Sequence, residues 1–110
     1  MKKSASCFLA ALVALGMMST VASADVKKGQ KVYLKTCKNC HGSGTKGAAM
    51  HTQDEWDELF ANGGAKIIKA HANDKSAAYF NGEAFKGQSQ DLRDFLFEYG
   101  SDSGNVPSCG

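Results

Sequence analysis

The feature that most restricts how this chain can fold is a five-residue run, Cys37-Lys38-Asn39-Cys40-His41. Two thiols and an imidazole stand within five positions of a chain of 110 residues. A chain of this length forms one small domain with a modest apolar core, so it commonly needs disulfides, a metal or a cofactor to hold it together. The run therefore indicates which kind of group stabilises the fold.

The first 24 residues have the composition of a secretory signal peptide. A basic start (residues 2–3) precedes an apolar run (residues 8–18), and small residues at 22–24 supply a cleavage site. The run is shorter than the roughly 20 apolar residues that a membrane-spanning helix needs, and Cys7 lies too early to be a lipid anchor. We expect cleavage after Ala24, export to the periplasm and no membrane span in the mature protein.

The mature chain, residues 25–110, excludes several classes of function. Two of the 13 Lys and Arg residues lie in the signal, so the remainder equal the 11 acidic residues in number. No basic surplus remains to bind nucleic acid. Its cysteines are Cys37, Cys40 and Cys109, an odd number that does not suit a disulfide framework. Cys109 lies in a polar tail (residues 101–110) and is expected to be free or paired with another molecule.

Apolar periodicity predicts an all-α domain over residues 25–100. Helices are expected at residues 26–37, 52–61, 65–72 and 89–99, the last of them capped by Ser89.

The connections between these helices also have recognisable signals. Thr52 and Glu55 form a capping box at the start of the second helix, and Asn62-Gly63-Gly64 ends it. The Gly-rich segment 42–47 is expected to have no regular structure.

Cys-x-x-Cys-His is the attachment sequence for haem c. Thiols about one helical turn apart can reach two vinyl groups of one porphyrin, and the adjacent histidine is placed beneath the iron. We therefore expect Cys37 and Cys40 to bind haem covalently and His41 to ligate the iron. Three alternatives compete: a zinc site, which lacks a second ligand pair here; a thioredoxin-like dithiol, which lacks a βαβ setting; and a plain disulfide.

The mature chain resembles the small class I monohaem cytochromes c over nearly all of residues 25–99. In that family, a glycine and an aromatic residue of the N-terminal helix pack against an apolar and an aromatic residue of the C-terminal helix. Here Gly29 and Tyr33 stand four residues apart on the first helix. Leu96 and Tyr99 are their expected partners on the last. The resemblance implies a cytochrome c-like fold, in which the two helices cross around one covalently bound haem.

The chain departs from the family pattern at the sixth iron ligand. Class I members usually place an axial methionine shortly before the last helix, but residues 80–87 contain none. The single methionine of the mature chain is Met50, nine residues after His41.

His71 is the sixth ligand that we favour, because it shares one face of a short helix with Ile67 and Ile68. Met50 is the next choice, and an open position, His51 and Cys109 remain alternatives. The choice matters because a thioether ligand raises the reduction potential, whereas an open position admits a small external ligand.

The function expected from these features is electron transfer by one haem c in a soluble periplasmic carrier, with redox proteins as partners. The alternatives are a haem subunit of a larger periplasmic oxidoreductase and a ligand-binding or sensing haem. No acid pair or nucleophile–base pair is evident, so we do not expect an enzyme. The protein is expected to be a monomer or part of a redox complex.

Overall fold

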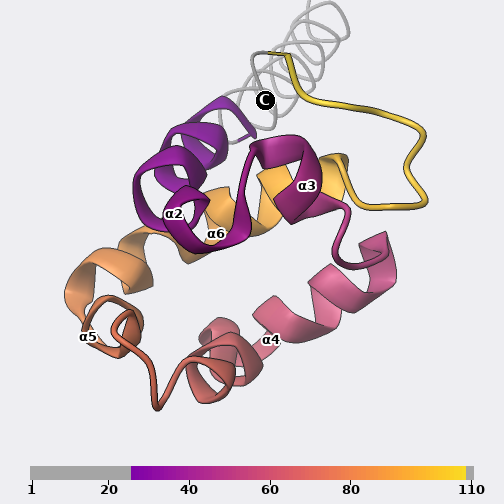
Figure 1. Ribbon diagram of the computed structural model, residues 1–110. Helices are drawn as coiled ribbons and strands as arrows, with labels where there is room; N and C mark the ends of the chain where they lie inside the picture. The colour runs from indigo at the N-terminus through magenta and orange to yellow at the C-terminus, as the bar shows by residue number, and fades with distance from the viewer. Residues whose placement is uncertain (1–25, 109–110) are drawn as a thin grey trace, which may run out of the picture.

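The computed structural model describes residues 26–108, so the expected signal peptide and Cys109 lie outside the described residues. Within that range every regular element is helical, which confirms the all-α prediction. Residues 26–36 are helical and are followed by five labelled helices (Figure 1). These are α2 (Lys38–His41), α3 (Gly44–Ala48), α4 (Gln53–Ala70), α5 (Ala77–Phe80) and α6 (Glu83–Glu98). None of the helices in the described part is long and apolar enough to cross a membrane.

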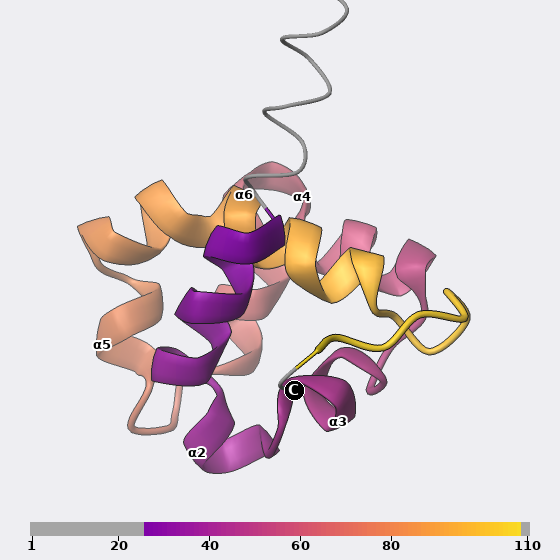
Figure 2. The ribbon, with the colours of Figure 1, turned by 90° about the horizontal axis from the view of Figure 1, so that it is seen from above.

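The helix at residues 26–36 crosses α6, as Figure 2 shows. Gly29 lies at the crossing, where a β-carbon would stand 1.9 Å from the carbonyl oxygen of Asp91 and 2.7 Å from Cβ of Phe95. Only a glycine allows the two backbones to approach this closely. The predicted crossing is thus confirmed.

The residues nearest to the crossing differ in part from the predicted partners. Gly29 faces Asp91 and Phe95, about one helical turn before Leu96 and Tyr99. The ring of Tyr33 packs against Phe95 with ring centroids 5.6 Å apart. Phe95 in turn packs against Tyr99, with ring centroids 5.3 Å apart. The aromatic partner was misassigned because Phe95 and Tyr99 lie four residues apart on the same helix face.

The prediction that residues 42–47 lack regular structure is wrong. Helix α3 begins within this segment, and the Ser43 hydroxyl accepts a hydrogen bond from the Lys46 amide at 3.3 Å. Gly47 lies directly beneath Tyr33, since a β-carbon there would stand 1.9 Å from the phenol oxygen. Gly47 of α3 therefore serves close packing against the first helix, which a count of glycines cannot distinguish from flexibility.

Helix α4 begins and bends as predicted. The hydroxyl of Thr52 accepts from the Glu55 amide, and the Glu55 carboxylate accepts from the Thr52 amide, which completes the capping box. The backbone leaves helical geometry at residues 61–64, and Asn62, Gly63 and Gly64 all have positive φ. Helix α4 (Gln53–Ala70) thus contains the two separate helical segments that the sequence predicted.

Helix α6 begins six residues earlier than predicted. Its N-cap is Gly82, so Ser89 lies inside the helix and does not cap it. Phe85, in the first turn, is 1 % exposed and lies seven residues before Leu92, on the same face. The apolar stripe of α6 therefore extends back to Phe85, and that spacing was the signal for the earlier start.

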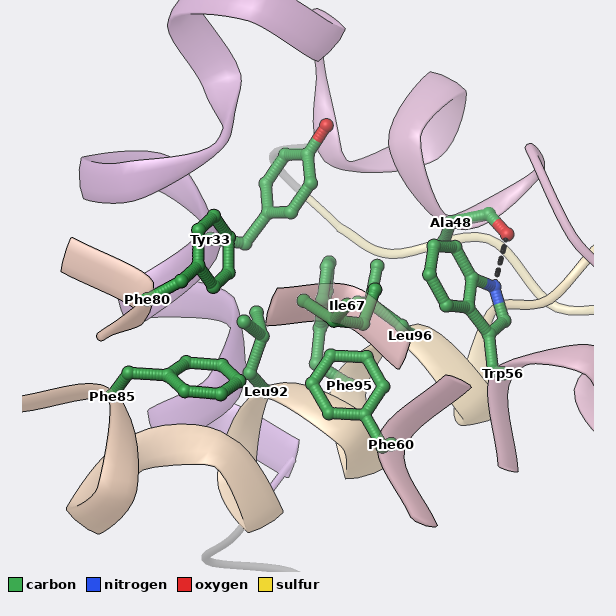
Figure 3. Close-up of a cluster of buried hydrophobic side chains, with 10 residues drawn as sticks. All are labelled: Tyr33, Ala48, Trp56, Phe60, Ile67, Phe80, Phe85, Leu92, Phe95 and Leu96. Atoms are coloured by element: carbon green, nitrogen blue, oxygen red, sulfur yellow. Dashed lines mark hydrogen bonds between the residues drawn. The ribbon is translucent and has the colours of Figure 1, made fainter. Parts of the chain in front are cut away.

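The core consists mainly of aromatic and branched aliphatic side chains drawn from all the longer helices (Figure 3). No polar or charged residue is buried in the described range, although Tyr33 and Trp56 bring a hydroxyl and an indole N–H to its edge. The indole of Trp56 donates to the carbonyl of Ala48 at 2.8 Å, which fixes α4 against α3.

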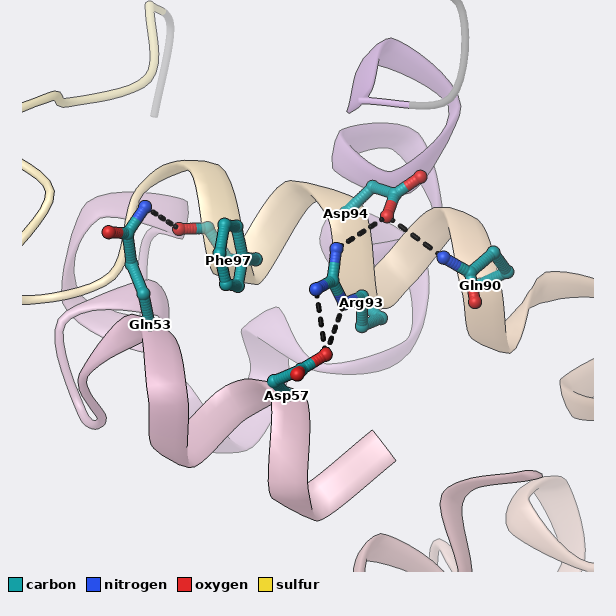
Figure 4. A network of polar contacts seen from close by, with 6 residues as sticks. All are labelled: Gln53, Asp57, Gln90, Arg93, Asp94 and Phe97. Atoms are coloured by element: carbon teal, nitrogen blue, oxygen red, sulfur yellow. Dashed lines mark hydrogen bonds and ion pairs between the residues drawn. The ribbon is translucent and has the colours of Figure 1, made fainter. Parts of the chain in front are cut away.

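A polar cluster on the outside joins α4 to α6 (Figure 4). The Arg93 guanidinium donates to the Asp57 carboxylate at 2.7 Å and to Asp94 at 3.0 Å, and it lies 4.2 Å from the ring centroid of Phe97. Gln53 adds a second link by donating to the Phe97 carbonyl at 3.0 Å.

Candidate haem site

The predicted site residues converge on one cavity of about 420 Å³. Its lining includes Cys37, Cys40, His41 and His71, and the rest is mostly aromatic and aliphatic. The volume lies in the range of roughly 300–1,000 Å³ that is typical of pockets for cofactors and other small molecules. The lining residues come from the first helix, α2, α4, α5 and α6, so the fold is arranged around this space.

The two cysteines open onto the cavity from the end of the first helix. The Cys37 amide donates to the Tyr33 carbonyl at 2.8 Å, and the carbonyl of Cys37 then accepts from the amides of Cys40 and His41. This tight turn places both free thiols and the imidazole of His41 on the cavity wall. Cys37 is half-buried, whereas Cys40 is exposed at the rim.

The Cys37 thiol has no feature of a reactive dithiol. Burial raises the pKa of Cys37, and a contact of 3.3 Å with the hydroxyl of Thr36 only partly offsets this effect. Redox-active pairs instead have a lowered thiol pKa. The structure therefore gives no support to the thioredoxin-like alternative.

The zinc alternative also finds no support. Across residues 26–108, no group of three or more His, Cys, Asp or Glu side chains converges in a way that could hold a metal ion. A structural zinc site requires four such ligands. Within the described range, the two thiols and His41 are therefore not part of a four-ligand zinc site.

The imidazoles of His41 and His71 face the same space, with ring centroids 6.1 Å apart and ring planes at 84°. His71 is the residue after the last turn of α4. Its Nδ1 donates a hydrogen bond to the Ile67 carbonyl at 2.8 Å, and its ring stacks on Phe80 of α5 at 4.3 Å. The turn at the end of α4 and helix α5 thus hold this ring in place.

The two other ligand candidates in the described range are placed less favourably. Met50 lines the cavity but is 46 % exposed, in the turn after α3. His51 also touches the cavity, but its ring packs edge-on against Trp56 at 4.7 Å and its Nδ1 lies 3.6 Å from the Glu55 carboxylate.

Sequence reasoning missed three polar residues of the cavity, Thr36, Asp74 and Ser76. Ser76 donates to the Asp74 carboxylate from its amide and its hydroxyl; these bonds are the main reason why the pKa of Asp74 is lowered, and His71 and His41 lower it further. The position of Thr36 beside Cys37 and the Asp-x-Ser spacing were signals available in the sequence.

The site fits a covalently attached haem. It offers two free thiols and an imidazole from one turn, a second imidazole across the cavity, and an apolar wall formed by residues such as Trp56 and Phe60. Thiols serve the attachment, imidazole nitrogens are common axial ligands of haem iron, and an apolar wall suits the faces of a porphyrin.

Comparison with known proteins agrees with this geometry. Residues 24–96 match the family model described as Cytochrome C oxidase, cbb3-type, subunit III, and the matched stretch contains all the cavity residues named above. No curated protein and no solved structure matches the chain. Because the match covers more than half of the sequence, the chain belongs to this family of c-type cytochromes, whose members transfer electrons through covalently bound haem c.

Proposed function

We propose that the protein is a soluble periplasmic electron carrier with one haem c, and that it is not an enzyme. The observation that supports this most is the convergence of Cys37, Cys40 and His41 on one apolar cavity whose rim reaches the surface at Cys40. The sequence contains a single Cys-x-x-Cys-His run, which supports one haem, and its N-terminal segment supports export.

Each part of the site has a role in this function. The thiols of Cys37 and Cys40 would hold the haem by thioether bonds, and His41 would supply a nitrogen ligand to its iron. When bound, the haem supplies the Fe(III)/Fe(II) couple. The aromatic wall would cover the apolar faces of the bound ring, while the exposed position of Cys40 brings one edge of the site close to the surface, where a redox partner can approach.

Mass spectrometry of the exported protein, produced with a working haem-ligation system, tests the cofactor. We expect the mass of the polypeptide after signal removal plus one haem. Cys37→Ala and Cys40→Ala should each lower the yield of covalently bound haem, whereas Lys38→Ala, which lies between them, should not. A colourless protein with the mass of the bare polypeptide would show that the proposal is wrong.

A second candidate function is that of a haem subunit in a larger oxidoreductase. The family to which the chain belongs is described as a subunit of an oxidase, which favours this possibility. Gel filtration of a native extract, followed by haem staining, distinguishes the two. A carrier elutes near its monomer mass, whereas a subunit elutes with a large complex.

A further inference from the structure

We propose that His71 is the second axial ligand of the haem iron, so that the iron is held between two imidazoles. This inference rests on the proposed function, because it requires that haem occupies the cavity. It departs from the methionine ligand that the resemblance to class I cytochromes suggests.

The separation of the two rings is the first argument. A bond between a transition metal and an imidazole nitrogen is about 2.0–2.1 Å long, so two imidazoles on opposite sides of one metal have ring centres roughly 6 Å apart. The observed separation of 6.1 Å between His41 and His71 agrees with that spacing. The angle of 84° between the rings is also compatible, since each ring can turn about its own metal–nitrogen bond.

The protonation of His71 is the second argument. A carbonyl oxygen can only accept, so the 2.8 Å contact with Ile67 requires the proton to be on Nδ1. When Nδ1 carries the only ring proton, the lone pair is on Nε2, which is the atom that a metal needs. Histidine ligands of metals usually donate their other ring N–H to a carbonyl or a carboxylate in this way.

The rigidity of the ring is the third argument. Phe80 stacks on His71 at 4.3 Å with the planes 25° apart, and Phe80 itself is 5 % exposed. Phe80 in turn packs against Phe85 at 5.0 Å, so the support continues into α6. A ligand held by packing before the metal arrives loses little conformational entropy on binding.

The competing side chains lack this combination. The ring of His51 is engaged by Trp56 and lies close to Glu55. The side chain of Met50 is 46 % exposed and lies in a turn. Of these three side chains, His71 combines a hydrogen bond of 2.8 Å to a backbone carbonyl with a ring that faces His41.

Spectroscopy of the purified ferric protein tests the proposal through four variants. We expect the wild type to be six-coordinate and low-spin, without the charge-transfer band of a methionine sulfur ligand. His71→Ala should lose the low-spin signal and become high-spin, and added imidazole should restore it. His71→Met should remain low-spin with a higher reduction potential, because thioether ligation favours ferrous iron. The matched controls, His51→Ala and Met50→Ala, should keep the wild-type spectrum.

The outcomes also separate this inference from the proposed function. A haem-containing protein in which His71→Ala stays low-spin while Met50→Ala turns high-spin would overturn the ligand assignment in favour of Met50. A high-spin wild type that binds carbon monoxide without displacing an internal ligand would overturn it in favour of an open position. Absence of haem from the wild type would instead contradict the proposed function. Imidazole rescue shows whether His71→Ala has kept its fold.

Discussion

Tyr33 shows how one residue connects the haem motif to the rest of the molecule. Its ring is 1 % exposed and packs on Phe95, while its hydroxyl donates to the carbonyls of Gly42 and Ser43, which directly follow His41. Burial is the main reason why the pKa of Tyr33 is raised to about 12. The phenol therefore remains protonated, as these two hydrogen bonds require, throughout the neutral range.

Tyr33→Phe is expected to destabilise the protein by about 1–2 kcal/mol, because two carbonyls next to the motif lose their donor while the ring is kept. Denaturant unfolding of the ferric protein measures the change. Tyr79→Phe is the matched control: its hydroxyl donates to the side chain of Gln88 and not to a backbone carbonyl beside the motif, so its cost should be smaller. An equal or larger loss in the control would contradict this role for Tyr33.

Comparison of the wild type with Tyr33→Phe also gives a test that depends on pH. A tyrosine whose folded pKa is raised contributes stability that is fully present below its unfolded pKa, near 10, and is lost as the pH rises towards its folded pKa, about 12. The stability advantage of the wild type over Tyr33→Phe should therefore shrink between about pH 10 and 12. An advantage that stays constant over this range would show that Tyr33 titrates normally.

Single residues of the site could be predicted from the sequence to the extent that their chemistry is local. Cys37, Cys40 and His41 form one contiguous motif, so their convergence required no knowledge of the fold. The hydrogen bond from His71 to Ile67 is also local. The distance between the rings of His71 and His41, however, depends on how α4 packs. No spacing in the sequence encodes that distance.

At the scale of elements, close helix contacts depend on glycines at particular positions. Gly29 meets backbone atoms of α6, and Gly47 meets the ring of Tyr33. The family resemblance predicted the close approach at Gly29. Gly47 lies in the Gly-rich segment that was expected to have no regular structure, so its contact was not predicted. Periodicity found the apolar face of α6 at Leu92, yet placed the start of the helix too late, because only Phe85 represents that face in its first two turns.

Gly29→Ala is expected to destabilise the protein by about 2–3 kcal/mol, because the added carbon would stand 1.9 Å from a backbone oxygen that can move only with the whole of α6. Gly87→Ala, inside α6, is the control. A β-carbon there meets nothing within 4 Å, so this variant should gain about 0.5–1 kcal/mol from helix propensity. Thermal unfolding of both variants measures the difference, and similar melting temperatures would contradict the close crossing.

For the whole molecule, the cavity of about 420 Å³ is lined by side chains from the first helix, α2, α4, α5 and α6. Apolar side chains that line an open cavity lack the contacts that a bound porphyrin would supply, so a chain of this small size would gain much of its stability from the bound group. The sequence indicated this dependence through the small size of the mature chain and its odd number of cysteines. How the segments that form the walls of the cavity come together could not be predicted, since they lie far apart in the chain.

The fold should therefore depend on the haem. The double variant Cys37→Ala/Cys40→Ala, prepared without haem, is expected to show reduced helicity by circular dichroism and no cooperative thermal transition, whereas the haem-bound wild type unfolds cooperatively. Added haem should restore helicity in the double variant, because His41 and His71 are still present to bind the iron. The same variant with His71→Ala should recover less, since one imidazole is lost. A haem-free double variant with native helicity and a sharp transition would show that the aromatic core alone, without the porphyrin, is sufficient to hold the helices together.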